Sequence, residues 1–151
     1  MQIEKICNSI LKSWFKGERI TAGYYNDESV GITCDGKVVY FIPVRKFPLD
    51  MEQMLGGRSY FEKFIKEPEE AEAVKLSNEI RVLENFKVQK LISQNHEVWV
   101  NTDYFKYFSK DACFFVYDVE SPMVNPVMVY ENRVLVGLIC RVNYKEGGKE
   151  E

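Results

Sequence analysis

The fold is decided at residues 29–42, which read SVGITCDGKVVYFI. Two apolar runs flank the pair Asp35-Gly36. An Asp-Gly pair tolerates the positive φ angles that a two-residue hairpin turn requires. The stretch therefore predicts two antiparallel strands, Ser29–Cys34 and Lys37–Ile42, joined by a tight turn.

A helix and a further strand precede this hairpin. Apolar residues recur at helical spacing along one stripe, and Gly17 is a suitable end for the helix. The stripe comprises Ile3, Ile6, Cys7, Ile10, Leu11 and Trp14. Residues Arg19–Tyr25 then predict a strand that completes a three-stranded meander.

The same order of elements recurs near the end of the chain. A short helix capped at Asn101 or Thr102 precedes a strand at Ala112–Val119, and a hairpin closes at Glu131-Asn132. We interpret residues 1–45 and 97–143 as pseudo-repeats. The predicted fold class is α+β, with duplicated helix-plus-antiparallel-sheet units in a single domain, residues 1–145. The two helices should then pack side by side on one sheet system.

The segment between the copies departs from the repeat. Residues 47–72 predict a helical insertion, with helices at 49–55 and 59–66 followed by an acidic run. Short strands are expected at 74–76 and 80–83, on either side of Ser77-Asn78, and at 86–92. Residues 146–151 predict a disordered tail.

Composition allows a substantial core and restricts the class of partner. The 151 residues are 46% hydrophobic and 14% aromatic, so they can bury a core. The net charge of −3 excludes a protein coated in basic charge.

No signal peptide and no apolar run near the length of a membrane span (about 18 residues) is evident, so a soluble, cytoplasmic protein without membrane contact is expected. The four scattered cysteines are expected to be buried thiols.

The apolar spacing also predicts a shared core. Its members come from both helices and from the closing strand. They are Ile6, Ile10, Trp14, Phe105, Phe108, Val134 and Leu138.

Several segments resemble DNA polymerase sliding clamps of the bacterial beta type. Residues 98–105 (VWVNTDYF) look like the clamp strand that enters a helix, and residues 121–124 (SPMV) with 134–142 look like the end of a clamp domain. Residues 40–45 (YFIPVR) are similar to the Pro-Val-Arg ending of those proteins. The resemblance implies helices that face DNA and sheets on the outside. A clamp subunit has three such domains, and this chain has room for one.

Five lysines are the candidate DNA-binding residues. They are Lys5, Lys12, Lys16, Lys106 and Lys110, on the polar faces of the two predicted helices. Side by side, the helices would present one stripe of positive charge to a phosphate backbone. Lysines on a helix face also serve simply as a solvated surface. The expected partners are double-stranded DNA or a replication protein, with homo-oligomerisation as a further possibility.

Residues for catalysis or metal binding are sparse. His96 is the only histidine, and the sequence places no nucleophile beside it. Residues 56–59 (GGRS) lack the Gly-Lys-Ser/Thr of a phosphate-binding loop. No cofactor and no metal is expected. The favoured function is a non-enzymatic, clamp-like accessory protein. The alternatives are a protein–protein interaction module without DNA binding and, third, a small-molecule enzyme of unknown class.

Overall fold

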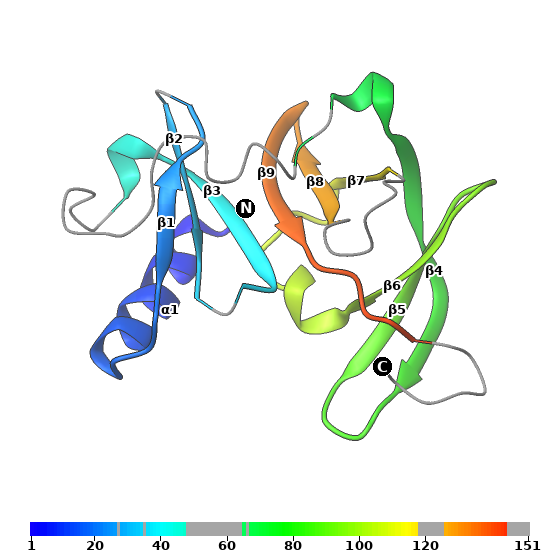
Figure 1. Ribbon diagram of the computed structural model, residues 1–151, viewed down its shortest axis with the longest axis horizontal. Coiled ribbons are helices and arrows are strands. Elements are labelled where there is room, and N and C mark those ends of the chain that lie inside the picture. Colours follow the sequence, from blue (N-terminus) through cyan, green and yellow to red (C-terminus); the bar gives the residue numbers. More distant parts are fainter. Residues whose placement is uncertain (27, 35, 48–64, 66, 118–125, 145–151) are drawn as a thin grey trace.

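A long antiparallel sheet organises the chain in the computed structural model (Figure 1), which describes residues 1–26, 28–34, 36–47, 65, 67–117 and 126–144. In chain order the elements are α1 (Ile3–Phe15), β1 (Thr21–Tyr24), β2 (Ser29–Thr33), β3 (Val38–Pro43), η1 (Val44–Lys46), η4 (Pro68–Glu70), β4 (Glu72–Val82), β5 (Lys87–Ile92), β6 (Glu97–Asn101), η5 (Thr102–Phe105), β7 (Cys113–Val116), β8 (Val127–Glu131) and β9 (Val134–Ile139). The η elements are single 3-10 turns.

The sheet curls back on itself. Its nine strands run in the order β1-β2-β3-β9-β8-β7-β4-β5-β6. Just beyond β9, Val142 pairs with Trp99 of β6, and the Val142 N–H donates to the Trp99 carbonyl at 2.8 Å. This bridge brings the last strand of the order next to the chain that leaves β9. Strands β4–β9 therefore form a strand ring (Figure 1), while α1 with β1–β3 forms an N-terminal layer beside it.

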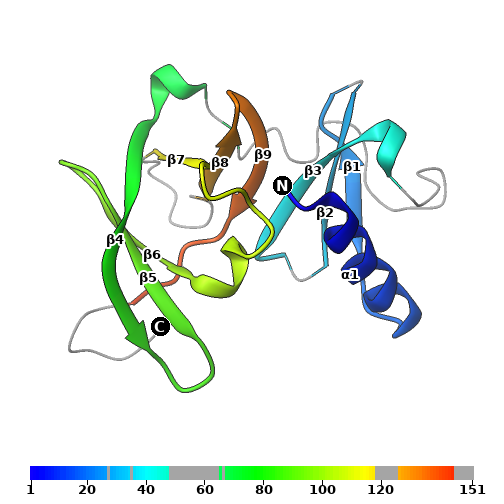
Figure 2. The same cartoon turned by 180° about the vertical axis from the view of Figure 1, so that it is seen from behind.

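The main core runs through both parts. Helix α1 lies across one face of β1–β3 (Figure 2) and buries Ile6 and Ile10 against that face. The same cluster continues into the ring, where Leu91, Val100 and Val127 are fully buried. Alternation of side chains along each strand aims one set inward, which is why the strands supply this interior.

A second apolar cluster lies apart from the main one. It comprises Val39, Phe41, Tyr117, Met128, Leu135 and Leu138. These side chains alternate with members of the main cluster along β3 and β8, so they occupy the opposite face of the sheet.

The N-terminal layer follows the sequence prediction closely. Helix α1 ends before Gly17, whose φ of +77° is the left-handed conformation expected there. Gly36, between β2 and β3, has a φ of +75°, but Ile32 pairs with Tyr40, so the connection is centred on Gly36 and is not the predicted two-residue turn. The three predicted strands form the meander β1-β2-β3.

The predicted fold class is wrong. The described residues form one nine-stranded antiparallel sheet with a single α-helix, and no duplicated helix-plus-sheet units. The segment at Thr102 is one four-residue 3-10 turn. A turn this short does not propagate into a helix, because the few backbone hydrogen bonds gained do not offset the cost of nucleation. It does lie on the same face as α1, in the main cluster.

The prediction of two short strands at 74–76 and 80–83 is also wrong. Ser77 and Asn78 were expected to separate two short strands, but β4 continues through them with a register shift between Leu76 and Ile80. Local hydrogen bonds hold the irregular stretch. The Ser77 hydroxyl donates to the Lys90 carbonyl at 2.9 Å, and the Gln89 side-chain amide donates to the Ser77 carbonyl at 2.8 Å. The strand at 86–92 is confirmed as β5.

The closing hairpin turns one residue later than predicted. Glu131 pairs with Val134, so the turn residues are Asn132 and Arg133, with φ angles of +51° and +66°.

The predicted core is right for some residues and wrong for others. Ile6, Ile10 and Phe108 are buried together, and Leu138 is buried in the other cluster. Trp14 is 45% exposed and Val134 is 60% exposed. Trp14 lies in the last turn of α1, beyond the buried Ile6 and Ile10, and is only partly covered. Phe105 is only partly buried.

Some predictions concern residues outside the described ranges. The helices at 49–55 and 59–66, most of the insertion at 47–72, and the tail at 146–151 fall there.

Candidate nucleic-acid interface

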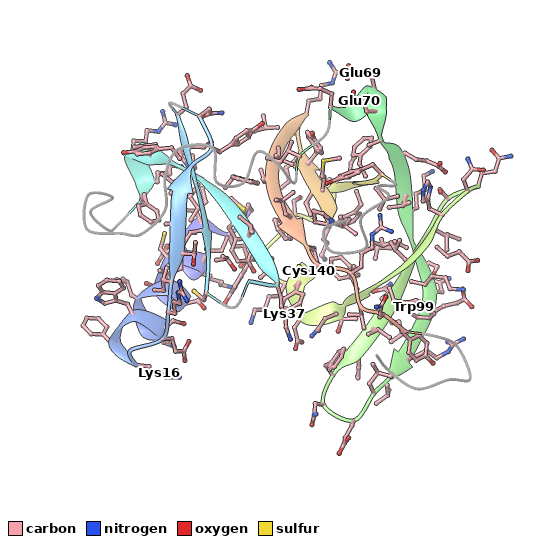
Figure 3. All side chains as sticks on the ribbon, viewed as in Figure 1. Lys16, Lys37, Glu69, Glu70, Trp99 and Cys140 are labelled. Atoms are coloured by element: carbon pink, nitrogen blue, oxygen red, sulfur yellow. The ribbon has the colours of Figure 1, made fainter. Side chains whose placement is uncertain are left out.

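Three of the five candidate lysines form a stripe along α1. At 3.6 residues per turn, Lys12 lies about 20° around the helix axis from Lys5, and Lys16 about 40° from Lys12. All three side chains are exposed. The buried Ile6 and Ile10 lie about 100–140° from Lys5, so the stripe points away from the core. Figure 3 shows Lys16 at the outer end of α1.

The turn η5 brings Lys106 to the start of α1. The Gln2 N–H donates to the Tyr107 carbonyl at 2.8 Å, and the Gln2 side-chain amide donates to the Lys106 carbonyl at 3.1 Å. The Lys106 ammonium sits 5.0 Å from the centre of the Tyr107 ring, a cation–π contact. These contacts fix the fourth lysine close to the helix that carries the other three.

The chain terminus holds α1 in place. The Met1 ammonium bonds to a Glu131 carboxylate oxygen at 2.6 Å, and the other oxygen accepts the Ser109 N–H at 2.6 Å. One carboxylate on β8 thus ties the helix start to the segment after η5. Charge-assisted bonds of this kind favour a defined helix position.

A groove of about 330 Å³ separates α1 from η5. Ser9 lines it from the helix, while Asp103 and Lys106 line it from the other side. The Asn101 side chain accepts the Asp103 N–H at 2.9 Å, as in a capped turn. The groove is polar at its rim and small compared with the surface that a nucleic-acid backbone would cover.

The fifth lysine lies elsewhere. Lys110 is exposed and lines a separate, larger groove between β4 and β7, together with Lys75. The structure therefore brings Lys5, Lys12, Lys16 and Lys106 to one side and places Lys110 at another groove.

Sequence reasoning missed two features beside the stripe. Phe15 is 84% exposed at the end of α1, next to the exposed Trp14. Arg19 is also exposed, just beyond Gly17, and adds a positive charge near that end. The sequence Trp14-Phe15-Lys16 carries a signal for this exposed end, because it places two aromatic residues beside a lysine in the last turn of the helix. An apolar stripe that continues into that turn does not by itself show that the turn is covered.

The only histidine belongs to a hydrogen-bonded turn. His96 Nδ1 lies 3.0 Å from a Glu72 carboxylate oxygen, and the Asn95 side chain donates to that carboxylate at 3.1 Å. Hydrogen bonds from Ser93 first, then from Asn95 and His96, lower the pKa of Glu72 from 4.5 to about 2. The carboxylate thus ties the β5–β6 turn to the start of β4.

Metal-binding and membrane-spanning features are absent from what the structure describes. Over those residues, no cluster of three or more His, Cys, Asp or Glu side chains could hold a metal ion. Within the same residues no helix has the length and apolar character to cross a membrane. The prediction of four buried thiols is wrong, since Cys7 and Cys34 are half-buried and Cys113 and Cys140 are exposed, although none of the four is in a disulfide within the described residues. Residues 56–59 lie outside the described ranges.

Comparisons with known proteins add no family. A scan against protein-family models, a search of curated proteins and a search of solved structures each found no match.

Proposed function

We propose that this protein binds the phosphate backbone of double-stranded DNA through the lysines of α1 and η5. The supporting observation is the stripe of Lys5, Lys12 and Lys16, extended by Lys106 at the start of the helix. The role is one of association, as an accessory protein to DNA, and it involves no chemical step by the protein.

The length of the stripe suits a phosphate backbone. Lys5 and Lys16 are eleven residues apart, which is about 16 Å along a helix. One DNA strand carries a phosphate about every 3.4 Å of axis, so the stripe runs beside about five of them. Exposed lysines supply charge and reach, and contacts to phosphate carry no base sequence. Binding should be indifferent to sequence.

The test is a fluorescence anisotropy titration with labelled duplex DNA over a salt series. Four phosphate contacts predict a slope of log affinity against log salt of about −3 to −4. Changing Lys12→Glu together with Lys106→Glu should abolish binding at low salt. Both side chains are exposed, so circular dichroism should show an unchanged fold.

A matched control separates the effect of the stripe lysines on DNA binding from the effect of the protein's net charge. Lys46→Glu with Lys87→Glu makes the same change in net charge at two exposed positions outside the stripe. Lys46 contacts α1 through Cys7, which lies about 160° around the helix axis from Lys5. It should weaken binding only slightly. Equal losses from both double variants would show that net charge alone acts, and no binding by the unchanged protein at low salt would refute the proposal.

A protein-interaction module without DNA binding is the second candidate. It is favoured by a row of exposed aliphatic side chains at alternate positions of β4, where Leu76 and Ile80 are each 47% exposed and Val82 is 75% exposed. Apolar side chains grouped on a surface mark interaction sites more often than isolated ones do. Light scattering on the unchanged protein and on an Ile80→Asp variant would detect self-association through this row.

A further inference from the structure

We propose a second binding site, for a single-chain fatty-acid carboxylate, in the groove between β4 and β7. This groove has a volume of about 680 Å³. Ligand pockets in proteins commonly measure about 300–1,000 Å³ and combine apolar walls with a few polar groups. The site is separate from the lysine stripe and does not depend on DNA binding.

The groove arises from a split in the wall of the strand ring. Strands β4 and β7 pair only as far as Val74 and Phe114. From Lys75 onward β4 pairs with β5. The residues on both sides of this split, 73–76 and 112–115, line the groove. Because the β4–β7 ladder stops there, side chains and not paired backbone form the opening.

The inner wall of the groove is apolar. Phe105, Phe108 and Phe114 line it, and the rings of Phe105 and Phe114 meet edge to face with centroids 5.5 Å apart. Leu76 lines the outer part and is 47% exposed. An alkyl chain seated here would remove apolar surface from water, which is favourable in proportion to the area covered.

Positive charge lies at the mouth. Lys75 and Lys110 line the groove from opposite sides and are both exposed, and among the described residues that line it none carries a carboxylate. Thr102 and Ser109 add hydroxyl groups. An ammonium group binds a carboxylate more strongly than a neutral head group. An apolar wall with a cationic rim therefore fits an amphipathic acid.

Isothermal titration calorimetry of the whole protein with octanoate, decanoate and dodecanoate tests the site. Affinity should rise about tenfold for each pair of added methylenes, because each buried methylene contributes a similar free energy. Lys75→Glu with Lys110→Glu should weaken dodecanoate binding about tenfold and leave dodecanol binding unchanged. Lys12→Glu with Lys106→Glu, the matched control, should leave dodecanoate binding unchanged.

Cysteine labelling places the ligand without altering the protein. Cys113 lines the groove and Cys140 does not, and both thiols are exposed. Dodecanoate should slow alkylation of Cys113 by iodoacetamide severalfold and leave Cys140 unaffected, as read by mass spectrometry. An Ala112→Trp variant should fill the groove and remove binding.

Two results would overturn the proposal. One is the absence of dodecanoate binding, and the other is equal protection of Cys113 and Cys140. If the first result came with binding to phosphatidylglycerol vesicles, a membrane surface would be the partner. A loss of DNA binding in the lysine-stripe variant has no bearing on these outcomes, so the two proposals fail separately.

Discussion

The N-terminal layer and the strand ring bury their apolar residues in different ways. In the layer, α1 covers one face of a three-stranded meander and keeps its other side in solvent. In the ring, the strands enclose the apolar residues themselves, and the β4–β7 ladder stops at Val74 and Phe114. A covered face leaves a polar helix surface free, whereas a split wall leaves an apolar groove open.

As a result, the two proposed binding surfaces differ in chemistry: one is mainly charged and the other is mainly apolar. The free side of α1 carries charge, as Figure 3 illustrates with Lys16 at its end. The groove of the ring carries aromatic rings behind two lysines. The turn η5 and the residues after it serve both, since Lys106 belongs to the first surface and Phe108 to the second.

Replacing Phe108 by Ala should have the largest effect and should affect both regions. Phe108 is buried, its ring centroid is 5.4 Å from that of Tyr40 in β3, and it packs beneath Gly137 in β9. Losing a buried phenyl ring leaves a cavity and should lower the free energy of unfolding by about 3–5 kcal/mol. Chemical denaturation followed by fluorescence measures the loss.

Each region has its own tryptophan to report this change. Trp14 is in α1, and Trp99, which Figure 3 labels, is in β6 of the ring. Trp14→Phe and Trp99→Phe variants therefore allow each region to be followed alone. With Phe108→Ala, both midpoints should fall together. A shift confined to one tryptophan would show that the layer and the ring unfold as separate units.

Replacing Gly137 by Ala should have the next largest effect. An added Cβ would lie 2.4 Å from Phe108 Cζ and 2.9 Å from the Val39 carbonyl oxygen, closer than such atoms approach. Overpacking of this kind costs about 1–3 kcal/mol. Denaturation of a double-mutant cycle with Phe108→Leu should show a smaller cost of the added methyl group in the Leu background. Equal costs in both backgrounds would mean that the ring of Phe108 is not the obstacle.

The layer was predictable from sequence because its contacts are local. A helical apolar stripe, the end at Gly17 and the turn at Gly36 are each decided within a few residues. The exposure of Trp14 was not predictable, since the helical period tells which residues share a side but not how far the sheet extends beneath them.

The ring was predictable only in pieces. Strands β5, β8 and β9 follow from alternation and turn residues, but the β3–β9 and β4–β7 pairs and the Trp99–Val142 bridge join distant segments. Alternation shows which side chains share a face and does not select the partner strand. The lysines of α1 were found by spacing, while the groove depends on where the β4–β7 pairing stops, which no local pattern records.

The acid limb of the stability curve, which is the fall in the free energy of unfolding as the pH is lowered, should depend on Glu72 in the ring. Its pKa in the folded protein, about 2, is below the ordinary 4.5, so the charged form is favoured by folding. That contribution is present above pH 4.5 and is lost as pH falls toward 2. Urea denaturation over this pH range should show a smaller loss for Glu72→Gln than for the unchanged protein.

A neighbouring carboxylate provides the control for this prediction. Glu70 is exposed in η4, two residues before Glu72, and Glu70→Gln should leave the acid limb as it is in the unchanged protein. NMR titration of the Glu72 carboxyl carbon gives the pKa directly. A midpoint near 4.5 would mean that the β5–β6 turn does not hold the carboxylate in solution.

The smallest effects are expected in the last turn of α1. Trp14 and Phe15 are 45% and 84% exposed, and Ile10, one turn earlier, is 2% exposed. Phe15→Ala should change the free energy of unfolding by less than about 0.5 kcal/mol and Trp14→Ala should lower it by about 1 kcal/mol, whereas Ile10→Ala should cost about 2–5 kcal/mol. Thermal and urea denaturation followed by circular dichroism make the comparison without a tryptophan signal. A cost for Trp14→Ala near that of Ile10→Ala would mean that the last turn of α1 is covered. The sheet would then cover the apolar stripe along the whole length of the helix, and only the lysine-bearing side of α1 would remain in solvent.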